Sequence, residues 1–293
     1  MIKISKESCI YAMSAKNKPV MHIEPGAQLQ FETWDALHGQ IKSSEGGFDG
    51  LDWSRVNPAT GPVYVNSAEV GDILSVKIDN IEIASEGVVV CGKGMGVMGS
   101  YLHGSAIKIV SIQDNIAHFS DTIKLPLNKM VGVIGVAPKD GDVPCGVPDL
   151  HGGNMDCKEI RDGATILLPV NVPGALLAMG DLHAVMADGE IGVSGLEVPG
   201  VVTVTVDVIK GRDLPLPMIY NDNHVMTLFS HEDLDIAADI AVANMVQYLI
   251  KEEGFTPEDA VMLISLVGDT RICQVVDPKK TVRVEFPKKH LQK

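Results

Sequence analysis

Short runs in which apolar and polar residues alternate, rich in valine and isoleucine, recur along most of this chain. The clearest runs are VYVNS at 63–67, ILSVKIDNIEI at 73–83, AIKIVSI at 106–112 and VVTVTVDVIK at 201–210. Successive side chains of a β-strand point to opposite faces of the sheet, so this period of two predicts strands. Turn-forming clusters such as NPATGP at 57–62 separate the runs. Strands at this spacing predict a mainly β fold with a β-sandwich or barrel-like body.

The pattern changes at Ser230, where apolar residues begin to recur at helical spacing in SHEDLDIAADIAVANMVQYLIKEEG. Ser230 is a suitable N-cap for this helix, and acidic residues follow it in the first turn. A second helix is expected after Thr256 as N-cap, with Pro257 at its first position. We therefore predict a β-rich body over residues 1–229 and a small α/β portion over 230–293 that contains a helical hairpin. The two are expected to form one cooperative unit.

Acidic residues exceed basic ones, and the formal net charge is -14. Such a surface repels phosphate backbones and anionic headgroups, so neither nucleic acid nor a membrane surface is expected as a partner. No run approaches the ~20 apolar residues of a membrane span. The five cysteines are scattered without a C-x-x-C pair, which is typical of a protein in a reducing compartment. We therefore predict a cytoplasmic protein without a disulfide framework.

The segment GKGMGVMGS at 92–100 contains a G-x-G-x-x-G spacing through Gly94, Gly96 and Gly99. A dinucleotide-binding loop of this type must open a helix whose N-terminus holds the pyrophosphate. Here the next residues, SYLHGSAIKIVSI, alternate like another strand. The segment is therefore predicted to be a glycine-rich turn between strands.

Four ionisable residues lie within GDLHAVMADGE at 180–190, between almost wholly apolar segments. Asp181 and His183 are two residues apart, so on a strand both side chains point to the same face. A carboxylate and an imidazole placed in this way suit a divalent ion of the zinc type. Asp188 and Glu190 flank an expected turn. A solvated acidic turn with a structural histidine is the alternative interpretation, but burial among apolar strands would demand partners for these charges.

A second polar segment, HGGNMD at 151–156, combines paired glycines with Asn154 and Asp156. Glycine allows the backbone to approach a ligand closely, so main-chain N–H groups around Gly152 and Gly153 are candidates for ligand contacts. This segment is the second predicted wall of the site.

The early segment ETWDALHGQI at 32–41 offers Asp35 and His38. Asp35 is a candidate for the same cleft, whereas His38 is equally typical of a surface residue. His103, between a leucine and a glycine in YLHGS, is kept in reserve as a candidate for a distant third ligand.

Taken in order, these motifs resemble the acetamidase/formamidase family. The similar segments, spread over residues 20–275, are ETWDALHGQI, GPVYVNSAEVGDILSVKI, GVIGVAP, HGGNMD and LPVNVPGALLAMGDLHAVMADGE. The resemblance implies hydrolysis of small aliphatic amides, acetamide or formamide, to the acid and ammonia. It also implies a β-rich fold with a small α/β portion, a homo-oligomer (dimer or higher) and zinc. By position, it places in the site Asp35, Gly152, Gly153, Asn154, Asp156, Asp181, His183, Asp188 and Glu190.

One segment departs from the longer formamidases of the family, which resemble His-Pro-His just before GVIGVAP. This chain has Asn128, Lys129 and Met130 there. The departure favours the shorter, acetamidase-like members.

On this basis we hypothesise that Asp156, Asp181 and His183 hold a divalent metal, with zinc preferred and calcium as the alternative. Such an ion would activate water for attack on an unreactive amide. Glu190 is predicted to be the general base and acid that takes the proton of the water and delivers it to the departing ammonia.

The remaining site residues are given supporting roles. Asn154 is predicted to stabilise the oxyanion, and Asp188 to orient the catalytic groups. Gly152, Gly153 and Asp35 are predicted to bind the substrate. An alternative from another class is a non-catalytic β-sandwich that binds a small ligand or structural calcium through the same acids, since calcium prefers oxygen ligands.

Overall fold

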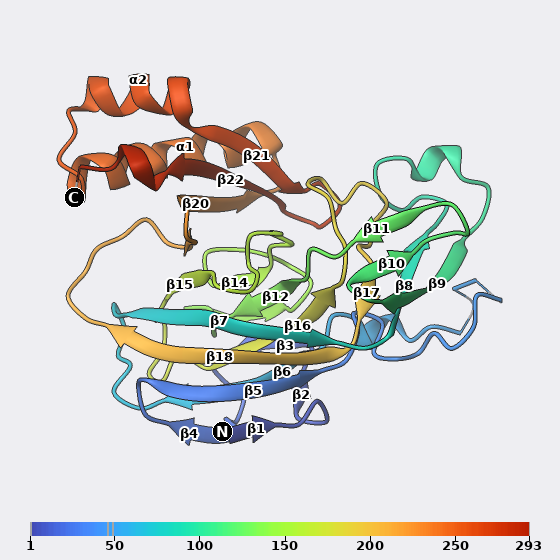
Figure 1. The fold of residues 1–293 in the computed structure, drawn as a ribbon. Coiled ribbons are helices and arrows are strands. Elements are labelled where there is room, and N and C mark those ends of the chain that lie inside the picture. Colours follow the sequence, from blue (N-terminus) through green and yellow to red (C-terminus); the bar gives the residue numbers. More distant parts are fainter. Residues whose placement is uncertain (1, 46, 49, 293) are drawn as a thin grey trace.

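The computed structural model describes residues 2–45, 47–48 and 50–292. Two large β-sheets pack face to face, and two helices lie at one end of the molecule, above β20 and β22 (Figure 1). The sheets are open and do not close into a barrel within the described residues. The predicted mainly β fold, with a sandwich-like body and C-terminal helices, is confirmed.

The first sheet has nine strands in the described part of the chain, and all of its pairs are antiparallel except that of β1 with β5. The long strands β18 and β7 at its centre correspond to the two longest alternating runs of the sequence. In spatial order the strands are β1 (Ile2–Ile4), β5 (Ala27–Thr33), β18 (Gly200–Ile209), β7 (Ile73–Ile83), β15 (Thr165–Pro169), β19 (Met218–Tyr220), β20 (His224–His231), β22 (Lys280–Pro287) and β21 (Asp269–Gln274).

The second sheet has eleven strands in the described residues, with β12 between β14 and β16. Its main path is β11 (Lys124–Pro126), β10 (Ile116–His118), β9 (Ala106–Gln113), β8 (Glu86–Cys91), β17 (Glu197–Val198), β16 (Leu177–His183), β12 (Met130–Gly135) and β14 (Gly152–Asn154). The other edge of β16 pairs with β6 (Ala59–Val65), which also pairs with β2 (Cys9–Ile10) and β4 (Met21–Ile23). A small separate sheet joins β3 (Ala12–Ser14) to β13 (Asp142–Pro144).

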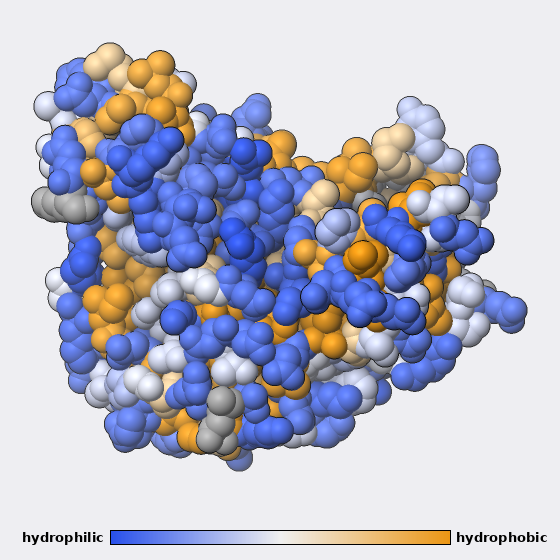
Figure 2. Space-filling view, in the orientation of Figure 1, coloured by the Kyte–Doolittle hydropathy of each residue, from blue (hydrophilic) through white to orange (hydrophobic). Residues whose placement is uncertain are grey.

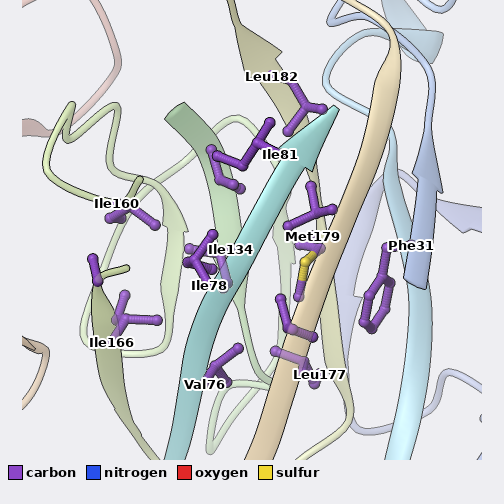
Figure 3. Close-up of a cluster of buried hydrophobic side chains, with 14 of the residues drawn as sticks. Phe31, Val76, Ile78, Ile81, Ile134, Ile160, Ile166, Leu177, Met179 and Leu182 are labelled. Carbon is purple, nitrogen blue, oxygen red and sulfur yellow. The ribbon is translucent and has the colours of Figure 1, made fainter. Parts of the chain in front are cut away.

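The main core lies between the two large sheets. Figure 3 shows Val76 and Ile78 of β7 facing the same buried cluster as Ile134 of β12 and Met179 of β16. All four side chains are fully buried. Burial of apolar surface is the main force that holds such sheets together. This packing fixes the positions of β12 and β16, the two strands that carry the centre of the candidate site.

The C-terminal helices are α1 (Leu234–Lys251) and α2 (Pro257–Val267). They form a second apolar cluster with β20 and β22. Thr256 caps α2 through the backbone N–H of Asp259, as predicted. The predicted start of the first helix is wrong, because Ser230 lies in β20 and contacts Thr281, and the N-cap is Asp233.

The proposed division at residues 229 and 230 stays a prediction. Strand β20 crosses it and pairs with β19 on one side and β22 on the other. In the described residues, no helix has both the length and the apolar character needed to cross a membrane.

Candidate active site

His183 lies at the centre of a buried cluster of carboxylates. It ends β16, and the pairing of β16 with β17 places it opposite Glu197. Its Nε2 atom is 3.1 Å from Glu197 Oε2 and 3.3 Å from Asp181 Oδ1. Its other ring nitrogen, Nδ1, is 3.2 Å from the sulfur of Met186. The imidazole therefore directs Nε2 towards the acids.

Two further acids complete the cluster. Asp156 follows β14, and its Oδ1 atom is 3.9 Å from Nε2 of His183. Glu190 lies in the loop between β16 and β17, where its Oε1 accepts the N–H of Gly195 at 3.1 Å. Ligand atoms lie within 4.8 Å of one another both in the group Asp156, His183 and Glu190 and in the group Asp181, His183 and Glu197. Both groups could hold a metal ion.

The C-terminal strands contribute one more acid. Asp277 lies in the turn between β21 and β22, and its Oδ2 atom accepts the Nδ2–H of Asn154 at 3.0 Å. Both residues line a cavity of about 130 Å³.

 The polar lining of this cavity includes Asn154 and the acids Asp181, Glu190, Glu197 and Asp277. The apolar lining residues are Ala36, Leu37, Trp53, Val56, Val90, Met95 and Val193.

Three of the acids have unusual backbone conformations. Asp156 has a φ of 42°, Asp181 of 56° and Glu190 of 44°. Val193, which lines the cavity, has a φ of 82°. Non-glycine residues rarely adopt this left-handed region, and each costs of the order of 1–3 kcal/mol. Such strain gathers at functional sites, where the surrounding structure imposes it.

Gly132 of β12 makes the close approach of two acids feasible. A β-carbon at this position would lie 2.5 Å from Asp156 Oδ1 and 2.8 Å from Asp181 Oδ2. Both distances are far shorter than a normal contact. The missing side chain therefore provides the space into which the two carboxylates converge.

The electrostatics reflect many acids around one imidazole. Burial alone would lower the pKa of His183, but Glu197 and Asp181 raise it well above its usual value. Burial raises the pKa of Asp156 and Glu197 well above their usual range, and that of Glu190 to about 8. Burial opposes the charge of Asp181, yet His183 lowers the pKa of that carboxyl. One imidazolium cannot balance all of these buried carboxylates, so several of them hold a proton unless a further positive charge lies beside them.

Several polar atoms in the cluster make no hydrogen bond of suitable geometry in the described structure, although some of them lie close to one another. They are Asn154 Oδ1, both carboxylate oxygens of Asp156, Asp181 Oδ1, His183 Nε2, Glu190 Oε2 and Glu197 Oε2. Buried polar atoms without partners are rare, and each requires an explanation. Carboxylate oxygens around an imidazole nitrogen form a donor set that suits a divalent ion. The residues present therefore fit a metal ion.

Comparison with known proteins identifies the family of this chain. The profile of the Acetamidase/Formamidase family matches residues 15–141 and 145–291. The chain belongs to this family. The acetamidase of Bacillus halodurans is 42% identical, with a TM-score of 0.96 over 98% of this chain and 97% of that one. A recombinant predicted acetamidase/formamidase from Thermoanaerobacter tengcongensis is 46% identical, with a TM-score of 0.95 over 98% and 95%.

A curated relative is more distant. A Schizosaccharomyces pombe protein, named provisionally as a formamidase, is 24% identical over 258 residues. The match covers 67% of this chain and 63% of that protein, so the chain spans less than two thirds of that relative's length.

In this acetamidase/formamidase chain, the structure brings five of the predicted site residues together. Asp156, Asp181, His183 and Glu190 form the buried cluster, and Asn154 borders it. The predicted placement of Asp181 and His183 at the end of one strand agrees with β16. Their roles in metal binding and catalysis stay predictions.

Four other predicted site residues lie outside the cluster. The carboxylate of Asp188 contacts Arg283 and Lys158. That of Asp35 accepts the N–H groups of Leu37 and Gly39, and Leu37 in turn lines the cavity. Gly152 and Gly153 lie in β14 beside β12, and neither lines the cavity. Their contributions to substrate binding, and that of Asp188 to catalysis, stay predictions.

The two histidines considered as further ligands also lie outside the buried cluster. His38 contacts the hydroxyl of Tyr11 at 3.1 Å, and His103 is exposed. Neither belongs to a group of described residues that could hold a metal.

Sequence reasoning missed Glu197 and Asp277. Glu197 stands alone in the apolar run SGLEVPG, and an isolated acid in a buried strand is itself a signal that a partner is needed. Asp277 follows an apolar run in CQVVDPKK, where it looks like an ordinary turn residue. Strand pairing brings Glu197 to His183, and Asp277 reaches Asn154 from the turn between β21 and β22.

Proposed function

We propose that this protein hydrolyses small aliphatic amides, acetamide and formamide among them, to the carboxylate and ammonia. The observation that carries the proposal is the set of unpartnered buried polar atoms around His183, beside a cavity of about 130 Å³. Sites for drug-sized ligands usually have volumes of about 300 Å³ or more. A cavity this small favours a ligand of only a few non-hydrogen atoms. Family membership supports the same reaction.

Asp156, Asp181 and His183 would hold the metal, with Glu197 as a further ligand. Zinc is proposed because it accepts imidazole nitrogen together with carboxylate oxygen. When bound, such an ion polarises a carbonyl group and makes water a better nucleophile.

Glu190 is proposed to transfer protons. The N–H of Gly195 holds Oε1, which leaves Oε2 without a partner in the described structure. Oε2 would take a proton from water as the water oxygen bonds to the amide carbon. The same proton would pass to the amide nitrogen as the carbon–nitrogen bond breaks and ammonia leaves.

Asn154 is proposed to orient the substrate. Its Nδ2 group donates to Asp277, so its unpartnered Oδ1 atom is the one free to accept an N–H of the amide. This differs from the oxyanion role predicted for its side chain, which would need a free N–H. Asp277 thus acts by fixing the orientation of the Asn154 amide.

The first test is ammonia release from formamide, acetamide and propionamide, with metal content measured alongside. We expect activity to be lost after chelation and restored by zinc, because water alone attacks an amide slowly. Calcium supplied at the same concentration is the control. Ammonia release that is indifferent to chelation would move the chemistry to the carboxylates alone.

The calcium-binding alternative has one observation in its favour, because carboxylates outnumber imidazoles in the cluster. A protein that retains calcium, releases no ammonia from any of the three amides and unfolds more readily after chelation would support this alternative. It would contradict the proposed hydrolysis.

Gly132→Ala is expected to weaken metal binding by about ten- to a hundredfold, an effect typical of disturbed ligand positions. The new methyl group would collide with Asp156 and Asp181. Gly104→Ala is the control, since a β-carbon at Gly104 has no atom within 4 Å. Metal affinity, measured by competition with a chromogenic chelator, should separate the two variants. Equal affinities would contradict the proposed ligand set.

A homo-oligomer and a cytoplasmic location remain proposals. What supports association is exposed apolar surface on α2, where Val261, Met262 and Leu266 are 53%, 54% and 78% exposed. Figure 2 shows apolar residues gathered at that end of the molecule, at the upper left. Large exposed apolar groups often mark contact surfaces.

A further inference from the structure

The glycine-rich loop at 92–102, between β8 and β9, forms part of the wall of the cavity. It is held in shape by its own hydrogen bonds, from Met95 N to Gly92 O and from Gly94 N to Gly99 O, each 3.0 Å. The prediction of a turn between strands is confirmed for this segment. Such internal bonds favour one conformation of an otherwise flexible sequence.

The loop is docked on the segment that follows Glu190. Val97 N donates to Ile191 O at 2.9 Å. A β-carbon at Gly96 would lie 2.5 Å from the same oxygen, so the two backbones are in close contact. The position of the loop is therefore tied to that of the proposed catalytic acid.

Within this fully described loop, Met95 alone lines the cavity. Val97, Met98 and Tyr101 are exposed to solvent instead. The sulfur of Met95 lies over Gly92, since a β-carbon there would be 3.0 Å from Sδ. The loop thus contributes one flexible apolar side chain to the wall of the cavity.

Four of the other apolar lining residues are less free to change in size. Leu37 and Val90 belong to a buried cluster with Ile107, and Val56 and Val193 pack against it. Changing any of these would disturb that packing. Met95 is not part of the cluster, so its size can vary without loss of core packing.

We propose that Met95 sets the upper length of the acyl group that this enzyme accepts. This inference rests on the proposed amide hydrolysis. The acids and Asn154 are polar parts of the lining, so the acyl chain would lie against its apolar residues, to which Met95 belongs. The side chain would admit acetamide and exclude longer amides such as butyramide.

The test compares kcat/KM for acetamide and butyramide. In Met95→Ala, we expect the butyramide to acetamide ratio to rise about tenfold or more, as for one methylene group in an apolar pocket. Met98→Ala, in the same loop but 46% exposed, is the matched control and should leave the ratio unchanged. Met95→Leu, which nearly conserves volume, should keep the original selectivity.

The possible failures can be told apart. A ratio that stays unchanged in Met95→Ala, or rises equally in Met98→Ala, would overturn the role of Met95 while the unchanged protein still cleaves acetamide. A protein that cleaves no amide before any substitution would overturn the proposed function and this inference with it. A variant that folds poorly would lose activity on acetamide and butyramide alike, and the ratio of the two kcat/KM values would not change. The thermal midpoint of each variant, with Met95→Leu as the comparison, identifies that case.

Discussion

Glu190→Gln is expected to lower kcat/KM for acetamide by about a hundred- to ten-thousandfold, the usual contribution of a positioned acid and base. Glutamine keeps the shape of the side chain and can still accept the N–H of Gly195. It cannot take a proton from water at the oxygen that is unpartnered in this structure. The measurement is the steady-state rate of ammonia release.

Metal content decides how a loss of activity is interpreted. Asp156, Asp181, His183 and Glu197 are unchanged in this variant, so bound metal should be retained. Glu69→Gln is the control, because the side chain of Glu69 is 80% exposed. Full turnover by Glu190→Gln with metal bound would show that another group transfers the proton. Loss of metal together with activity would instead assign Glu190 to the ligand set.

Periodicity predicted the body of the fold well, because each strand carries its own signal. Strands β7 and β18 coincide almost residue for residue with the alternating runs at 73–83 and 201–210. The start of α1 was harder to predict, since Ser230 is as good an N-cap by type as Asp233. Pairing with β22 extends β20 through Ser230, and no local pattern contains that partner.

The residues of the candidate site could likewise be predicted only in part. Asp181, His183 and Glu190 are close in the sequence, so one segment indicates all three. Glu197 reaches His183 through strand pairing, and Asp277 reaches Asn154 from the turn between β21 and β22. These contacts depend on register and topology, which the sequence of one segment does not specify.

Arg283→Met is expected to lower the free energy of unfolding by about 3 to 5 kcal/mol, as for a buried ion pair that loses one partner. Arg283 is fully buried in β22 and donates two bonds to Asp188, at 2.6 and 2.9 Å, and one to Glu285 at 2.7 Å. Lys158 remains near Asp188, which favours the lower end of the range. Urea denaturation measures the change.

Arg271→Met is the matched control, because Arg271 also contacts Glu285 but its side chain is 44% exposed. Exposed pairs contribute about 1 kcal/mol or less. Equal losses in the two variants would contradict a special role for the buried pair. The effect should also reach the site, because Asp188 lies two residues before Glu190 and the N–H of Gly189 is bound to Cys273 O at 2.9 Å. We therefore expect Arg283→Met to hydrolyse acetamide more slowly even well below its unfolding midpoint, while Arg271→Met keeps its activity.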